Sequence, residues 1–229
     1  IDDWIQLIDD VMLKTYPLDG DPNRVMGIHH TAVDSQGLEG VTAKAYEFWR
    51  MLRENPDFPV GMQNKFTLLR GTRNLAAPRV SIIYPDSQDK GRKNALSRGD
   101  IPVMQVNGTM VKDQLSAMLD KKDIGGGYVH FPKWLPNWFY EEMCAEIRTP
   151  KGWENPKRAR NEAWDLLVYA LALCLSNKVN LDRFDWDNPP SWAEEWDVNS
   201  LVFGVKEEIP FTKPPENDIT IEELAGSLG

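Results

Sequence analysis

The stretch that most constrains the fold is residues 157–176, with the sequence KRARNEAWDLLVYALALCLS. After its basic start it is apolar apart from two carboxylates and the hydroxyl of Tyr169, so we expect a helix over about 160–176 that is buried on nearly every side. Glu162 and Asp165 are three residues apart and project from the same face of that helix. A buried carboxylate requires a cation, either a basic side chain or a metal ion. The alternative is that acidic residues are simply favoured in a first helical turn.

Charge is distributed unevenly along the chain. The formal total is −9, but residues 181–229 hold twelve acidic and three basic residues, which leaves residues 1–180 with 23 of each. Within residues 65–160 there are 17 basic and 10 acidic residues, a net charge of +7. A neutral body with a basic middle is compatible with binding a polyanion on one face, whereas the acidic tail would be repelled by one.

Length and composition predict one large domain followed by a tail. The chain has 229 residues, 41% of them hydrophobic, with nine Trp, which is enough to fill a sizeable core. Cys144 and Cys174 lie in apolar surroundings, so we expect free thiols in a reducing compartment. Because no stretch resembles a membrane span or a signal peptide, we expect a soluble cytosolic protein. The chain begins at Ile1 within a helical pattern, and we expect it to be a fragment of something longer.

Hydrophobic periodicity predicts alternating helices and strands, which argues for an α/β sandwich. Helices are expected over residues 2–15, 41–53, 111–119, 138–147 and 160–176, and strands over 24–33, 66–69, 79–84 and 101–106. The glycines at 125–127 lack the lysine and hydroxyl of a phosphate-binding loop, so we expect only a turn into a short strand near Tyr128. The acidic Trp- and Pro-rich tail, 181–229, is expected to anchor to a protein surface through its tryptophans and to be dispensable for the compact fold.

A third carboxylate lies far from the first two in sequence. Asp34 follows the predicted strand 24–33, and functional groups gather at such strand ends in α/β sheets. Together with Glu162 and Asp165 it would form a cluster of oxygen ligands suited to Mg²⁺ or Mn²⁺. Two such ions about 4 Å apart are the usual device for phosphodiester hydrolysis.

Each candidate also has a structural interpretation. Asp34 could be an N-terminal cap of the following helix, Lys112 a solvated helix residue, and His29, His30 and His130 hydrogen-bonded strand histidines. A polar loop over 86–100 and the start of the last predicted helix carry the candidate contacts to DNA phosphates. These are Lys90, Arg92, Lys93 and Arg98 in the loop, and Arg158 and Arg160 before the helix.

Four segments, in order, carry a resemblance: AVDSQGLEGVTAKAYEF, VMQVNGTMVKDQL, GGGYVHFP and RNEAWDLLVYALA. Over about residues 1–176 the chain resembles the nuclease domain of lambda-type large terminase subunits, the motor-nucleases of tailed bacteriophages. The resemblance implies an RNase H-like fold and a two-metal DNA endonuclease that cuts concatemeric viral DNA in the host cytoplasm. It also implies double-stranded DNA, the small terminase subunit and the capsid portal as partners, with the tail reaching the portal.

The resemblance assigns roles to individual residues. Asp34 matches the carboxylate after the central strand, although the family's Asp-Ser-Gly-Gly here reads Asp-Ser-Gln-Gly. Glu162 and Asp165 match the acids of the last-helix motif. Lys112 matches the lysine that follows the next-to-last core strand, but the spacing is about two residues longer here, and Met110 competes for that alignment.

Two parts of the family's pattern are absent from this chain. The first carboxylate, in an Asp-Val-Gln strand, has no counterpart, and no GxxxxGK[ST] motor motif occurs. The early acids Asp2, Asp3, Asp9 and Asp10 are expected on a helix, which argues against their replacing it. The alternative is that the strand comes from another polypeptide. We therefore expect an RNase H-like domain over 1–180 that lacks its first strands. Two other hypotheses stay open: a DNA- and portal-binding module without cleavage, and another RNase H-like nuclease of the resolvase or transposase type.

Overall fold

A mixed four-stranded sheet forms the centre of the molecule. In the computed structural model, which describes residues 2–37, 40–85 and 99–205, its strand order is β3-β4-β6-β5. The strands are β3 (Thr31–Asp34), β4 (Phe66–Gly71), β5 (Val80–Ile83) and β6 (Val103–Val106). Strands β3, β4 and β6 run parallel, while β5 pairs antiparallel with β6. The predicted α/β class is confirmed.

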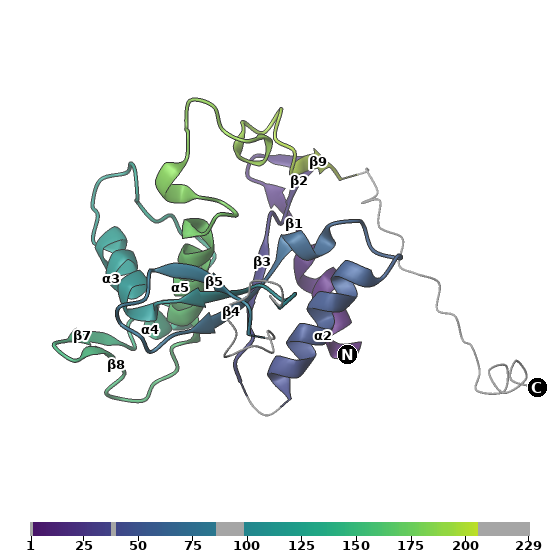
Figure 1. Ribbon diagram of the computed structural model, residues 1–229. Helices are drawn as coiled ribbons and strands as arrows, with labels where there is room; N and C mark the ends of the chain where they lie inside the picture. Colours follow the sequence, from purple (N-terminus) through teal and green to yellow (C-terminus); the bar gives the residue numbers. More distant parts are fainter. Residues whose placement is uncertain (1, 38–39, 86–98, 206–229) are drawn as a thin grey trace, which may run out of the picture.

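Helices cover both faces of this sheet (Figure 1). They are α1 (Asp2–Leu7), which continues as a π-helical turn over Ile8–Met12, α2 (Val41–Glu54), α3 (Gly108–Leu119), α4 (Asn137–Met143) and α5 (Glu162–Leu175). The helix predicted over 138–147 ends earlier, and a hairpin of β7 (Ile147–Thr149) and β8 (Gly152–Glu154) follows it. The short strand expected near Tyr128 does not form.

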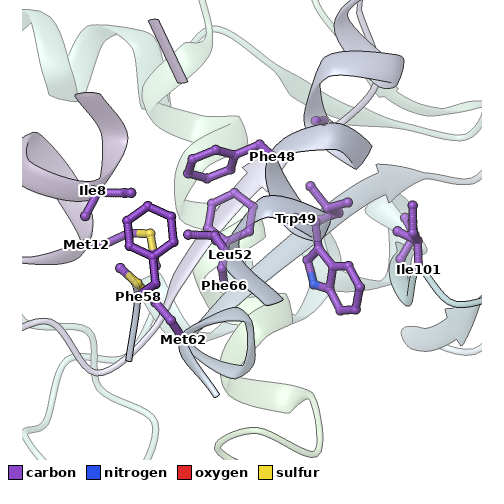
Figure 2. Packing of buried hydrophobic residues seen from close by; sticks show 12 residues of the cluster. Ile8, Met12, Phe48, Trp49, Leu52, Phe58, Met62, Phe66 and Ile101 are labelled. Carbon is purple, nitrogen blue, oxygen red and sulfur yellow. The ribbon is translucent and has the colours of Figure 1, made fainter. Parts of the chain in front are cut away.

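The alternation of side chains along the strands divides the core in two. Leu68 and Val103 point to the face covered by α1 and α2 and belong to the cluster of that face. Figure 2 shows this cluster, with Phe48 and Leu52 of α2. The next residue of each strand, Leu69 and Met104, points to the opposite face and packs with α3 and α5. Because every one of these strand side chains is at most 1% exposed, the sheet has no solvent face at its centre. Because Leu69 and Met104 are buried, α5 has to pack across their face of the sheet.

The predicted strand over 24–33 is wrong as a single element. Residues Asp21–Gly27 form β2, which pairs with β1 (Thr15–Leu18) and with β9 (Val202–Gly204) in a separate antiparallel sheet. The chain leaves that sheet at Ile28–His30 and enters the central sheet as β3. A period-two pattern cannot reveal such a transfer, because both halves alternate in the same way.

Residues 181–205 of the predicted tail contact the body. Strand β9 pairs with β2, the ring of Trp192 stacks on His29 at 4.2 Å between centroids, and Arg24 binds Asp197 at 2.7 Å. Trp186 is 71% exposed.

Within the described part of the chain, no helix is long and apolar enough to cross a membrane. Cys144 and Cys174 are free thiols.

These contacts revise the expectation for the tail. We expect truncation after Val205 to leave cooperative unfolding intact, whereas truncation after Asn180 should lower the urea midpoint because it removes β9 and the stacked Trp192. Urea titrations followed by circular dichroism of both truncations measure this. Equal midpoints for the two would show that residues 181–205 add no stability to the body.

Candidate active site at the end of strand β3

A pocket of about 370 Å³ lies between the end of β3 and one face of α5. Asp34 from β3 and Glu162 and Asp165 from α5 all line it, together with Tyr169 and His30. The two elements that carry the acids are separated by more than a hundred residues of sequence and meet through the core on the α5 face of the sheet. The structure thus brings the three predicted carboxylates to a single pocket.

Asp34 is placed by the parallel pairing of β3 with β4. Its register partner is Leu69, and the next residue, Ser35, donates from both its backbone N–H and its hydroxyl to the Leu69 carbonyl, at 2.9 and 2.7 Å. Asp34 Oδ1 accepts the backbone N–H of Gln36 at 2.9 Å. Since α2 begins only at Val41, the interpretation of Asp34 as a helix cap is wrong.

Helix α5 is less buried than its apolar sequence predicts. Trp164 and Val168 are buried against the sheet, but Glu162, Leu166 and Ala170, spaced four residues apart, form an exposed stripe. Leu166 is 66% exposed. The prediction of burial on nearly every side is therefore wrong for this stripe, which lines the open pocket.

Tyr169 connects the helix to the strand-end carboxylate. Its hydroxyl donates to Asp34 Oδ2 at 3.1 Å. Burial raises the pKa of Tyr169, and the negative charges of Asp34, Asp165 and Glu162 raise it further. The phenol therefore stays protonated as a donor, in a pocket that all three carboxylates line.

Asp165 has a basic partner from another helix. Lys112 Nζ on α3 lies 2.9 Å from Asp165 Oδ1 and also contacts both carboxylate oxygens of Glu146, at 2.9 and 2.7 Å. The side chains of Lys112 and Glu146 are only 15% and 8% exposed. Lys112 is thus not a solvated helix residue, whereas Met110 is 42% exposed.

Glu146 was missed in the sequence, because it lies 34 residues from Lys112, at the end of a predicted helix where a charged residue is unremarkable. Asn161, which precedes α5, bridges the same groups: its Nδ2 donates to Glu146 Oε1 at 2.7 Å and to Asp165 Oδ2 at 3.0 Å. Lys112, Glu146, Asn161 and Asp165 form one continuous polar network, which reaches the pocket through Asp165.

The donor set suits a hard divalent cation, but the described arrangement does not yet form its site. Among residues 2–37, 40–85 and 99–205, no three His, Cys, Asp or Glu side chains gather closely enough to hold a metal ion. Asp165 is paired with Lys112 and Asp34 with Tyr169. Carboxylate oxygens in a shared negative field match Mg²⁺ or Mn²⁺ in charge and donor type, and the metal site stays a prediction.

Only some of the residues predicted to contact DNA lie in the part of the chain that the structure describes. Lys90, Arg92, Lys93 and Arg98 lie outside the described residues. Arg158 is exposed, with a left-handed φ of 50°, and Arg160 is 75% exposed while its Nε lies 3.0 Å from Glu142. These two guanidinium groups stand just before α5, on the same helix end as Glu162. Their contacts with DNA stay a prediction.

The histidines are not strand residues. His29 and His30 lie in the connection between β2 and β3, where His29 stacks on Trp192 and His30 Nε2 is 2.7 Å from the Thr67 hydroxyl. His130 lies outside regular secondary structure and packs against Tyr128 at 4.8 Å. Only His30 lines the carboxylate pocket.

Comparison with known proteins agrees with this geometry. Residues 1–186 match the family of the terminase large subunit gpA, endonuclease domain. The chain belongs to this family. The matched range contains β3, α5 and every carboxylate of the pocket, and it supports a nuclease role in phage DNA packaging. The comparisons with curated proteins and with solved structures gave no match.

His30 should make the stability of this terminase domain sensitive to acid. Burial, together with the nearby charges of Lys178 and His29, lowers its pKa to about 4. In the unfolded chain a histidine titrates near 6.5, so between about pH 6.5 and 4 only the unfolded state gains the proton and stability falls. As the pH falls from about 6.5 to 4, the urea midpoint, measured in the presence of EDTA, should drop less in His30→Gln than in the wild type. His130→Gln is the matched control, and parallel pH curves for all three proteins would contradict the prediction.

Proposed function

We propose that this chain is the metal-dependent endonuclease domain of a phage packaging terminase and that it cuts concatemeric viral DNA. The observation that carries the proposal is the single pocket in which β3 and α5 collect Asp34, Glu162 and Asp165. Membership of the terminase endonuclease family supports nuclease chemistry. Three carboxylates that line one pocket offer the oxygen ligands and negative charge that divalent cations favour.

We further propose an RNase H-like arrangement of the sheet. Parallel strands β3, β4 and β6, with the last helix packed across them and an acid at the end of β3, support it. Strand β3 pairs with β4 and with no other strand among the described residues, and Leu166 is exposed beside the pocket. The family resemblance expects its first carboxylate on a further strand, and the edge of β3 is where such a strand would pair.

In this proposal Asp34, Glu162 and Asp165 hold one or two Mg²⁺ or Mn²⁺ ions, which when bound activate water and stabilise the leaving oxygen. Tyr169 fixes the orientation of the Asp34 carboxylate through its 3.1 Å hydrogen bond. Lys112 supplies a positive charge beside Asp165, where it would stabilise negative charge on a bound phosphate. Leu166 and Ala170 give the pocket an apolar side.

Double-stranded DNA is the proposed substrate, bound by the basic loop and by Arg158 and Arg160. The acidic region from residue 181 onward would be repelled by DNA, and its exposed Trp186 supports a protein partner. We propose the capsid portal as that partner. The small terminase subunit as a second partner, and action in the host cytoplasm, follow from the family alone.

The metal site is tested by replacing a carboxylate. Asp165→Asn and Asp34→Asn should each lower Mn²⁺ affinity by about 100-fold, because a charged ligand is lost and the effect exceeds that of removing an outer-sphere partner. Titration calorimetry measures the affinity, and conversion of supercoiled plasmid to nicked and linear forms measures cleavage. Asp120→Asn, an exposed acid at the end of α3, is the matched control.

A second candidate is the DNA- and portal-binding module without cleavage. Among the described residues, no three His, Cys, Asp or Glu side chains gather closely enough to hold a metal ion, and this favours the binding module. A folded wild-type chain that retains DNA but shows no Mn²⁺ binding and no plasmid cleavage would support this module and refute the endonuclease. Mn²⁺ affinity unchanged in both carboxylate variants would instead show that the ion binds elsewhere.

The basic loop is tested by reversing charge. The double variant Lys90→Glu, Arg92→Glu should bind duplex DNA more weakly and reduce the slope of log K against log salt by about two. Fluorescence anisotropy over a salt series measures both quantities. Reversal of Lys14 and Lys44, which lie outside the loop, is the control; an unchanged slope in the loop variant would show that the loop does not touch phosphates.

A further inference from the structure

We propose that Glu146 is a positioning residue that sets how readily Asp165 binds a divalent cation, because it retains Lys112 when Asp165 releases it. This inference rests on the metal-binding role proposed above for Asp165. It concerns a residue that neither the sequence patterns nor the family match singles out.

The geometry shows which carboxylate holds Lys112 more firmly. Glu146 contacts the ammonium through both oxygens, at 2.9 and 2.7 Å, whereas Asp165 contacts it through one, at 2.9 Å. The Glu146 side chain is 8% exposed and that of Asp165 is 41% exposed. Lys112 is therefore shared between a buried partner with two contacts and a pocket-facing partner with one.

Asn161 reinforces this division. An Asn immediately before a helix ordinarily caps the first turn with its side chain, but here the side chain makes no capping bond. Glu142 Oε2 takes that role by accepting the backbone N–H of Ala163 at 2.9 Å. The Asn161 side chain instead donates from Nδ2 to Glu146 Oε1 and to Asp165 Oδ2.

Competition between cations follows from this arrangement. A divalent ion on Asp165 Oδ1 would share that oxygen with an ammonium, and the two positive charges repel each other. Lys112 must then give up Asp165. Leaving Glu146 as an unpaired buried charge is costly, so Lys112 stays with Glu146 while Asp165 becomes available. Glu146 thus lowers the cost of freeing the metal ligand.

The experiment is a mutant cycle read by Mn²⁺ titration calorimetry on the whole chain. In Glu146→Gln, Lys112 keeps Asp165 as its negative partner in this cluster, so the ion pair between Lys112 and Asp165 becomes tighter. Mn²⁺ affinity should therefore fall about tenfold, the scale of outer-sphere effects. In the double variant Glu146→Gln, Lys112→Met both charges are gone, and affinity should return to the wild-type value or exceed it. Glu141→Gln, an exposed acid on α4, removes the same charge away from the cluster and should change nothing.

A second readout follows the lysine itself. Side-chain NMR of Lys112 during Mg²⁺ addition should show the ammonium changing environment in the wild type, and circular dichroism confirms that each variant is folded. Wild-type Mn²⁺ affinity in folded Glu146→Gln overturns the inference, as does a double variant as weak as the single one, while the proposed metal site survives both results. Absence of Mn²⁺ binding in the wild type and in the double variant refutes the metal site and the inference together.

Discussion

The parallel pairing of β3 with β4 is the interaction on which the rest of this domain depends. Its register sets Asp34 opposite Leu69 and directs Leu68 and Leu69 to opposite faces of the sheet. Helices α1 and α2 cover one face and α3 and α5 the other (Figure 1). A slip of one residue would exchange the two faces of the strand, so the two cores and the position of the pocket are determined together.

The pocket brings together several negative carboxylates that have only a few donor partners. Asp34, Glu162 and Asp165 face it, and Glu146 lies just behind. Lys112 neutralises part of this charge, while Tyr169 and Asn161 contribute neutral hydrogen bonds. Each carboxylate with a partner is held in one orientation by that partner.

Residues 181–205 extend the domain beyond its central sheet. They complete the small sheet of β1, β2 and β9, and Trp192 stacks on His29, the neighbour of pocket residue His30. The same region keeps Trp186 exposed among acidic side chains. One segment therefore contributes an internal contact near the pocket and also carries an exposed tryptophan.

Local sequence determined the elements whose signal lies within a few residues: the amphipathic α2, the apolar β4 and β6, and α5 with its two acids. It also identified Asp34, Glu162 and Asp165, and the family motifs placed them in one class of enzyme. Only the tertiary structure decided the break at Ile28–His30, the pairing of β2 with β9, and the network around Lys112 and Glu146. These features join residues from distant parts of the chain, and no local periodicity encodes which buried charge will meet which partner.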